Sequence, residues 1–400
     1  MVADITNYVG REQAFVKPFF LESYLESLIY KTASVYDEIA YVDGFSGPWQ
    51  STGEDYADTS FGIALAALRK AKGTWKDQHG KDVRMSVYLV ERAAGPYANL
   101  EALKPKFPDI AIHTFHADFV ATAPQILAQI PAAAFAFFFI DPKGWRIDMA
   151  QLEALLKRPK SEVVFNFMFD FINRAASIDD PKIIAGLDAL MPHGDWKDRL
   201  AAIDAASGDR STARKVVLTE AFRQTLATMG GYTYVAEIPV LQRINDRTLY
   251  SLFYGTRHAK GIEVFRDCHV RTERQQATVR TATKRAHEEQ KSGQALLPWA
   301  DAQFAPDDNA AFLENEKAAA KGTFLSMVPT APAFITYDKV WPRVLEKHVI
   351  THPDVNKIGA DLRKAGDLAF PNWEAGKRVP HDSYRISKPD LLKAGRGSQP

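Results

Sequence analysis

The sequence predicts an α/β protein built on a doubly wound, mostly parallel sheet, and three observations support this prediction. Five short apolar segments alternate with segments of helical periodicity between residues 38 and 167. The segment FAFFFI (135–140) is apolar at every position, as expected of a central strand that is buried on both faces. The chain has 400 residues and is 46% hydrophobic, so it contains enough apolar material for a large core.

The predicted elements follow one another in a regular order. An amphipathic helix over 11–31 opens the chain, because its aromatic and leucine side chains recur at helical spacing. The five strands are predicted at 38–43, 85–91, 110–118, 135–141 and 161–167. Helical segments separate these strands and are predicted at 61–71, 95–107, 122–130 and 149–157.

Residues beyond the fifth strand show a different pattern. The stretch 172–230 is mostly helical and polar, so we predict a helical insertion there. The segments 232–241 and 248–256 are strand-like and joined by a short loop with Asn245-Asp246, which predicts an antiparallel hairpin. Five parallel strands closed by a hairpin form the Rossmann-like arrangement of class I methyltransferases, although other α/β folds can end in the same way.

The C-terminal part predicts a small second domain. We expect a domain over 1–290, a linker at 291–333, a winged-helix domain at 334–390 and a tail at 391–400. Helices are predicted at 338–349 and 352–366, with Thr351 as N-cap and Gly366 as the stop. A hairpin is predicted in 368–387, with its loop at 374–380.

Two basic stretches favour contact with nucleic acid. Residues 331–400 carry 12 Lys and Arg against 8 Asp and Glu, an excess of 4 (12 − 8). A winged helix can place a helix in the major groove, although such modules also dock proteins. The stretch 266–291 has 7 Lys and Arg against 4 acidic residues and predicts an exposed helix. A solvated charged helix is the alternative interpretation of that stretch.

Composition excludes several classes of protein. The net charge is +1, so any basic surface must be local. The single cysteine, Cys268, excludes an internal disulfide framework and a cysteine-based zinc site, and it fits a reducing cytosol. The N-terminus lacks the pattern of a signal peptide, and no apolar run reaches the ~20 residues of a membrane helix. We therefore expect a cytoplasmic protein without a membrane partner, and the histidines show no metal-binding pattern.

The first motif with a chemical meaning is DGFSG, which ends the first predicted strand. It places Asp43, Gly44, Phe45, Ser46 and Gly47 where open α/β sheets bind ligands. The glycines allow the backbone to approach a ligand closely, and the aspartate can accept hydrogen bonds from an amino group. The motif is not GxGxxG, which argues against a nicotinamide-dependent oxidoreductase. A glycine-rich turn without a ligand is the alternative.

Two further acids end the second and third predicted strands. Glu91, followed by Arg92, can accept hydrogen bonds from both ribose hydroxyls of an adenosine ligand. Asp118, followed by Phe119, occupies the same relative place one strand later. A solvated charge at a strand end is the alternative for Glu91 alone. Three acids at three successive strand ends together predict an adenosine-bearing cofactor, for which these residues would form the pocket.

The fourth strand ends in DPKGW, which contains the predicted catalytic residues Asp141, Pro142 and Trp145. Enzymes that methylate exocyclic amino groups of bases place an acid or Asn, two prolines and an aromatic residue here. The acid holds the amino group and the aromatic ring stacks on the extruded base. Lys143 replaces the second proline, and the aromatic residue comes one position late. A helix N-cap is the alternative role for the aspartate; Asn166 and Asp170 are further candidates for this crevice.

These stretches together resemble the three-Cys-motif partner (TcmP) family. The resemblance rests on DGFSGPW, FFFIDPKGW, the FNF strand and the opening helix with Lys17 and Tyr24, and the family's corresponding motifs are DGFAGPG and FIDPFG. It implies a methyltransferase-like fold, a C-terminal winged helix and a partner with a three-cysteine motif like that of radical-SAM enzymes. The sequence departs from the family at Trp49, where a glycine is usual, and at Lys143, where an aromatic residue is usual.

The sequence thus predicts an S-adenosyl-L-methionine-dependent methyltransferase that acts on nucleic acid. The alternative is a non-catalytic nucleic-acid-binding or adaptor subunit that has kept the methyltransferase fold. The imperfect DPKGW motif and Trp49 favour this alternative.

Overall fold

The computed structural model describes residues 12–47, 56–205, 210–242, 247–292 and 307–390, which form two compact units. Unit 1 contains the described residues up to His258 together with Ala282–His287, and unit 2 contains Ala259–Thr281 and the described residues from Glu288 onward. The sequence placed the domain boundary at residue 290 instead. The long helix α10 (Ala259–Ser292) accounts for the difference, because its first turns belong to unit 2.

Unit 1 is built on a seven-stranded, mostly parallel sheet with the strand order β3-β2-β1-β4-β5-β7-β6. The first five strands are parallel, and β7 pairs antiparallel with both β5 and β6. The strands are β1 (Glu38–Asp43), β2 (Arg84–Glu91), β3 (Ala111–His116), β4 (Phe135–Ile140), β5 (Ser161–Phe167), β6 (Tyr234–Leu241) and β7 (Thr248–Thr256). The five predicted parallel strands and the closing hairpin are therefore confirmed.

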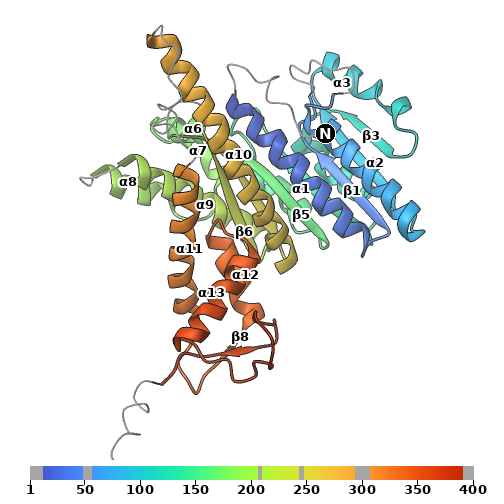
Figure 1. Cartoon of the computed structure of the whole chain (residues 1–400). Helices are drawn as coiled ribbons and strands as arrows, with labels where there is room; N and C mark the ends of the chain where they lie inside the picture. The colour runs from blue at the N-terminus through green and yellow to red at the C-terminus, as the bar shows by residue number, and fades with distance from the viewer. Residues whose placement is uncertain (1–11, 48–55, 206–209, 243–246, 293–306, 391–400) are drawn as a thin grey trace, which may run out of the picture. The chain divides into compact units, whose positions relative to one another are not determined.

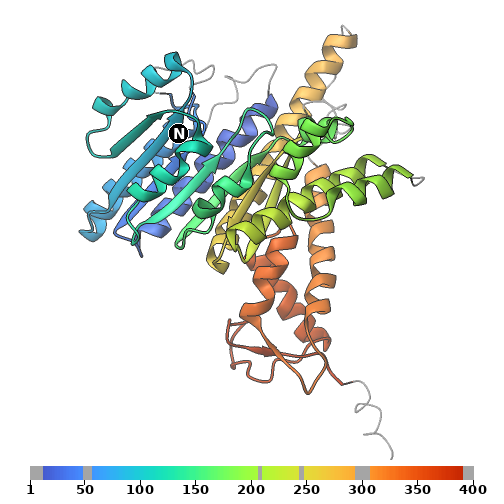
Figure 2. The same ribbon diagram turned by 180° about the vertical axis from the view of Figure 1, so that it is seen from behind.

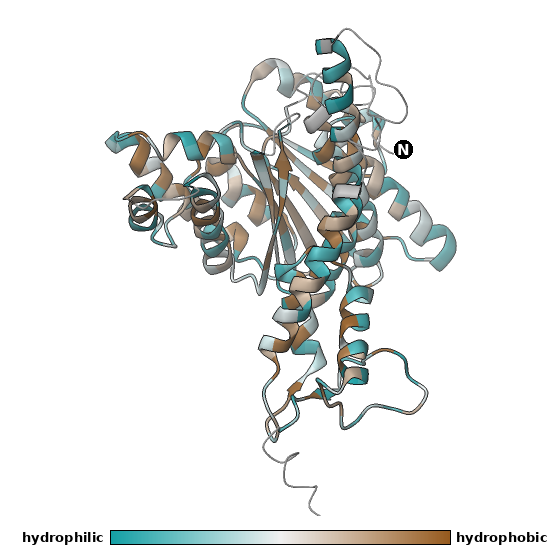
Figure 3. Cartoon of the chain, turned by 60° about the vertical axis from the view of Figure 1, so that its left-hand side comes forward, coloured by the Kyte–Doolittle hydropathy of each residue, from teal (hydrophilic) through white to brown (hydrophobic). Residues whose placement is uncertain are grey.

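The core of unit 1 follows from the composition of its central strands. All six residues of β4 and all seven of β5 are buried, because helices cover both faces of the sheet. Figure 3 shows hydrophobic segments concentrated in the sheet, whereas the outer helices carry hydrophilic residues. Burial of these apolar strands supplies the main driving force for folding this unit.

Two sets of helices cover the sheet. Helices α1 and α2 pack against each other and lie together on one face, as Figure 1 shows. The helices coloured teal to green cover the opposite face, which comes forward in Figure 2. The helices of unit 1 are α1 (Val16–Ala33), α2 (Ser60–His79), α3 (Ala94–Glu101), α4 (Phe119–Gln129), α5 (Met149–Leu156), α6 (Phe169–Ala175), α7 (Pro181–Leu190), α8 (Trp196–Ala205) and α9 (Arg210–Gly230), with the 3-10 turns η2 (Glu12–Phe15) and η3 (Lys104–Lys106). The last four of these α-helices occupy the stretch in which the sequence predicts a helical insertion.

Unit 2 combines three helices with a minimal strand pair. The helices are α11 (Asp307–Met327), α12 (Tyr337–Lys347) and α13 (His352–Ala365), which accompany the start of α10. Strands β8 (Ile335–Thr336) and β9 (Arg385–Ile386) pair antiparallel. Thr351 caps α13 through a capping box, and Gly366 ends it with a positive φ of 82°, as the sequence predicted.

Two expectations for unit 2 differ from the structure. The segment expected as a linker contains the 21-residue helix α11, whose alanine-rich sequence has a high helix propensity. The hairpin predicted in 368–387 is reduced to one bridge between Ala369 and Ser387, and its last strand pairs with β8 instead. Pro371, Gly376 and Pro380 account for this, because proline and glycine interrupt strand pairing.

The basic stretch 266–291 is helical, but it is not the freely exposed surface that we expected. Arg266 is buried, and its guanidinium donates to the backbone oxygens of Leu345 and Glu346 in α12. His269 and Thr272 are also buried on this part of the helix. One face of this part of α10 therefore packs within unit 2.

No helix in the described part of the chain is long and apolar enough to cross a membrane.

The capping box of α13 makes a stability prediction for unit 2. The side chain of Thr351 accepts from the Asp354 backbone N–H, and the Asp354 carboxylate accepts from the Thr351 backbone N–H. The variant Thr351→Ala removes the cap and should lower the local free energy of unfolding by about 1 kcal/mol. Hydrogen exchange of the α13 amides measures this change. Thr351→Ser keeps the hydroxyl and serves as the control; equal protection in the Ala and Ser variants would contradict the assignment.

Candidate functional site

A cleft of about 540 Å³ lies at the carboxyl edge of the sheet in unit 1. Strand β1 lies between β2 on one side and β4 on the other. The strands that follow β1 in sequence are added on the β2 side up to β3, and the next strand, β4, is added on the opposite side, so the strand order reverses between β1 and β4. Open α/β sheets bind ligands at such a switch point. Among the residues that line the cleft are eight that the sequence predicted, namely Gly44, Phe45, Glu91, Arg92, Asp118, Phe119, Pro142 and Trp145.

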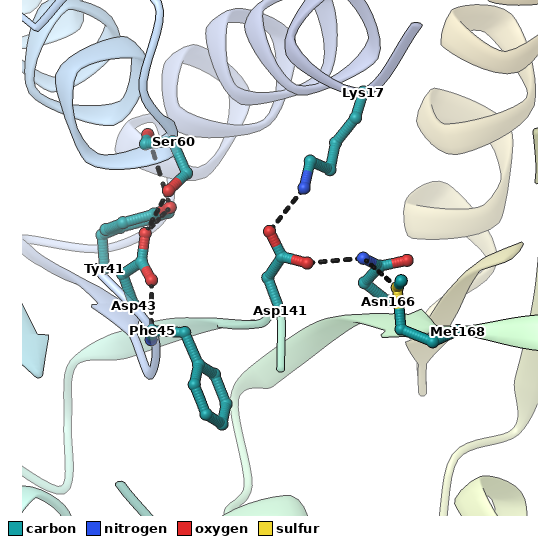
Figure 4. Close-up of polar contacts among 8 residues, drawn as sticks. All are labelled: Lys17, Tyr41, Asp43, Phe45, Ser60, Asp141, Asn166 and Met168. Carbon is teal, nitrogen blue, oxygen red and sulfur yellow. Dashed lines mark hydrogen bonds and ion pairs between the residues drawn. The ribbon is translucent and has the colours of Figure 1, made fainter. Parts of the chain in front are cut away.

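Asp43 lies behind the turn rather than in the cleft wall. Its carboxylate is fully buried and accepts hydrogen bonds from the Phe45 backbone N–H at 3.0 Å and from the Ser60 hydroxyl at 2.5 Å (Figure 4). Ser46 is also buried, and its hydroxyl donates to the Asp43 backbone oxygen at 2.8 Å. Gly47 is absent from the cleft lining as well. These residues shape the turn that brings Gly44 and Phe45 to the cleft.

The turn after β1 packs closely on the start of α4. A Cβ on Gly44 would lie 2.7 Å from the ring of Phe119, so only glycine fits between β1 and this ring. The φ of this glycine is not positive, and the requirement is therefore steric rather than conformational. The rings of Phe45 and Phe119 meet edge to face with their centroids 5.7 Å apart. Together they form an apolar part of the cleft wall.

Glu91 is a buried acid in the wall of the cleft. Its exposed fraction is 6%, which excludes the solvated charge considered above. One carboxylate oxygen accepts from the Ala93 backbone N–H at 2.6 Å, which fixes the side chain at the end of β2. Partial burial lowers the pKa of the Lys143 amine, and the carboxylate of Glu91 opposes that shift. The acid and the amine thus lie in one cleft from different strand ends.

Asp118 is the N-cap of α4. Its carboxylate accepts from the backbone N–H groups of Val120 and Ala121 at 3.0 and 3.3 Å. A helix N-terminus that faces a cleft offers further N–H groups and a partial positive charge. The residue lines the cleft in addition to capping the helix, so both roles coincide at this position.

Asp141 forms a polar cluster with residues of two other elements, which Figure 4 shows. Its Oδ2 lies 2.5 Å from the ammonium of Lys17 on α1, and its Oδ1 accepts from Asn166 of β5 at 2.5 Å. Helix α5 is capped by Asp148 and not by Asp141, which excludes the N-cap alternative. Asp141 is absent from the cleft lining, although its neighbour Pro142 belongs to it.

The loop after β4 and the start of α6 complete the cleft. Trp145 lines the cleft and packs against Gly186 of α7, where a Cβ would lie 2.7 Å from its ring. Phe171 also lines the cleft, with 47% of its surface exposed, and the sequence did not predict it. Exposed cationic side chains of Arg92, Lys143 and Arg146 belong to the same lining. The cleft therefore combines a buried acid, four aromatic rings and a basic rim.

Sequence reasoning found only some of these partners. Asp170, a candidate for the crevice, forms an ion pair with Arg174 at 2.9 Å and is absent from the lining. The role of Lys17 could not be derived from spacing, because 124 residues separate it from Asp141. Trp49 lies outside the described residues. Within those residues, no group of three His, Cys, Asp or Glu side chains could hold a metal ion.

No family model matches the chain, and no curated protein matches it in sequence. Among solved structures, the chain is similar to protein LPL1258 from Legionella pneumophila str. Philadelphia 1, described under the family model DUF519. The two chains are 13% identical, and the match covers 60% of this chain and 84% of that chain with a TM-score of 0.36. These values carry no argument about function.

The buried carboxyl of Asp43 predicts a pH-dependent stability. Burial raises the pKa of Asp43 to about 6. The hydrogen bonds from Ser60 and Phe45 have the opposite effect, but they only partly offset the effect of burial. The folded protein holds this proton more tightly than the unfolded chain, whose pKa is ~3.9. The resulting stabilisation is complete below pH ~4 and is lost as the pH rises through about 6, by up to roughly 3 kcal/mol.

Urea unfolding of wild type and Asp43→Asn at several pH values tests this prediction. The amide cannot ionise, so the wild type should lose stability relative to the variant between pH ~4 and ~7. Parallel pH dependences of the two proteins would show that Asp43 ionises as readily in the folded state as in the unfolded chain.

Proposed function

We propose that the protein is an S-adenosyl-L-methionine-dependent methyltransferase that acts on nucleic acid. One observation carries the proposal: the carboxyl ends of β1 to β4 border one cleft, which has a buried acid at the end of β2 and, at the end of β4, Pro142, which directly follows Asp141 in the chain. The strand order and the antiparallel β7 agree with the class I methyltransferase arrangement. The resemblance to the three-Cys-motif partner family points in the same direction.

The residues of the cleft fit an adenosine-bearing ligand. The volume of about 540 Å³ lies in the range of small-molecule sites. The Glu91 carboxylate would accept hydrogen bonds from the ribose hydroxyls, and the N-terminus of α4 at Asp118 would face the adenine. Gly44 and Phe45 would hold the chain of the ligand against the end of β1. When bound, S-adenosyl-L-methionine supplies a methyl group on a positively charged sulfur.

The opposite side of the cleft suits a nucleobase. Asp141 and the Pro142 carbonyl would accept hydrogen bonds from the amino group to be methylated. The rings of Trp145 and Phe171 offer stacking surfaces for an unpaired base. The exposed Arg92, Lys143 and Arg146 would attract phosphates to the rim. Holding both reactants in this geometry supplies most of what methyl transfer requires.

Unit 2 would bind the substrate chain or a partner. We assign its helices and strand pair to a winged-helix-like module, with α13 as the helix that contacts nucleic acid. Exposed arginines stack on aromatic rings there: Arg363 lies 4.3 Å from the centroid of Trp373, and Arg385 lies 4.4 Å from that of Phe334. The family resemblance adds a three-cysteine-motif protein as the partner to test by co-purification.

A second candidate function is a non-catalytic nucleic-acid-binding or adaptor subunit. One observation favours it: both carboxylate oxygens of Asp141 already have protein partners, Lys17 and Asn166. An adaptor would bind nucleic acid without transferring a methyl group. A labelled-methyl transfer assay on single-stranded DNA and RNA separates the two functions.

Cofactor binding is tested by calorimetry with S-adenosyl-L-methionine. We expect one site per chain, and Glu91→Gln should weaken binding by roughly 10-fold to 100-fold, because the ribose loses hydrogen bonds to a charged group. Glu153→Gln, on the exposed surface of α5, is the control and should bind as the wild type does. Absence of binding to the wild type would exclude the proposed enzyme.

The role of Asp141 is tested by methyl transfer at saturating S-adenosyl-L-methionine. Asp141→Ala should lower the rate at least ~100-fold, since the amino group loses its acceptor, while cofactor affinity stays nearly unchanged. Asp170→Asn changes a carboxylate that forms an ion pair with Arg174 on the same helix, and it should leave the rate unaffected. Loss of cofactor binding in Asp141→Ala would contradict the assigned role.

A further inference from the structure

The carboxylate of Asp141 is held on two sides by residues that the proposed function does not use. Lys17 contacts Oδ2 from α1, and Asn166 contacts Oδ1 from the neighbouring strand β5 (Figure 4). Each carboxylate oxygen can accept about two hydrogen bonds, so each oxygen keeps one acceptor position. The Asp141 side chain is 21% exposed, which leaves room for a donor to approach. The Asp141 carboxylate is thus a hydrogen-bond acceptor that Lys17 and Asn166 hold in place and that is partly exposed to a further donor, on what we call its open side.

Asn166 is placed to orient this acceptor. The residue is 3% exposed, and its amide nitrogen donates to both Asp141 Oδ1 and the Met168 sulfur, the latter at 3.4 Å. Its amide oxygen is buried without a hydrogen-bond partner. Burying an unpaired amide oxygen is unfavourable, so stability alone does not explain an asparagine at this position of a buried strand.

Lys17 brings a positive charge to the same acceptor. Its ammonium lies 2.5 Å from Asp141 Oδ2 and 6.0 Å from the centroid of the Tyr250 ring, and the side chain is 30% exposed. A second cation at the open side of Asp141 would lie close to this ammonium and be repelled by it. An uncharged N–H donor meets no such repulsion. The charge balance of the cluster therefore favours a neutral donor over a protonated amine.

We infer that Lys17 and Asn166 are positioning residues that orient Asp141 and make the acceptor site selective for an uncharged amino group. The substrate class that fits this site is the exocyclic amino group of a nucleobase and not the ammonium group of a lysine side chain. The inference rests on the proposed methyltransferase function, whose substrate it specifies.

The chemical step balances without a further reactant. The lone pair of the amino nitrogen forms the new N–C bond while the C–S bond of the methyl donor breaks and its electron pair stays on sulfur. The nitrogen then releases one proton, which the Asp141 carboxylate passes to water. Lys17 and Asn166 take no part in bond formation; they hold the carboxylate that orients the nitrogen.

Lys17→Met tests the inference, because it keeps the length of the side chain and removes its charge. The substrates are a random single-stranded oligonucleotide of about 20 nucleotides and a lysine-rich peptide, with a labelled methyl donor. We expect a fall in kcat on the oligonucleotide of roughly 30-fold or more, with little change in affinity for S-adenosyl-L-methionine. Lys17→Arg keeps the cation and should restore the rate to within about fivefold of the wild type.

A binding assay without turnover gives a second readout. With S-adenosylhomocysteine present, fluorescence anisotropy compares the affinities of the oligonucleotide and the peptide. The preference of the wild type for the oligonucleotide should fall about tenfold in Lys17→Met, through stronger binding of the peptide. Asn166→Ala should lower kcat without this change in preference, since it removes no charge.

The possible outcomes separate the inference from the proposed function. A wild type that binds no S-adenosyl-L-methionine overturns the proposed function and, with it, the methyl-transfer role of the cluster. A wild type that transfers methyl groups while Lys17→Met keeps both its rate and its preference overturns the inference alone. The inference is also overturned if Lys17→Arg does not restore a rate that is lost in Lys17→Met. Equal loss of cofactor binding in Lys17→Met and Lys17→Arg overturns it as well.

Discussion

The parallel pairing of β1 with β4 is the constraint on which the candidate site depends. Asp43 and Phe139 are paired residues in these neighbouring strands, so the chain places Asp43 and Asp141 at the same edge of the sheet. Two carboxyl groups at this edge cannot both be charged without compensation. The two carboxyl groups have different environments. Asp43 is buried and its pKa is raised, whereas Asp141 forms an ion pair with the ammonium group of Lys17.

Because of this difference, Asp43 and Asp141 have separate roles. Asp43 fixes the turn that leads from β1 to the cleft, and its hydrogen bonds to Phe45 and Ser60 are internal to the fold. Asp141 keeps an open side while its orientation is set by residues from α1 and β5. The opening helix α1, which is remote in sequence from β4, therefore contributes a residue to the site.

Much of unit 1 could be predicted from the sequence, because alternating apolar strands and helices determine a parallel sheet and its carboxyl edge. The acids at the strand ends followed from the same pattern, and Glu91 and Asp118 do line the cleft. The position of Asp43 behind the turn could not be predicted, since strand periodicity does not distinguish a wall residue from a buried support. Contacts between distant segments, such as Lys17 with Asp141, leave no periodic signal. Helix α11 was missed because the prolines on either side of it suggested a linker.

We propose that S-adenosyl-L-methionine binds in the cleft at the carboxyl ends of β1 to β4. A crystal structure with S-adenosylhomocysteine tests this claim most directly. We expect the ribose hydroxyls to lie within hydrogen-bond distance of Glu91, with the sulfur on the side of Asp141. A ligand bound elsewhere on the protein, or a ribose that does not contact Glu91, would contradict it.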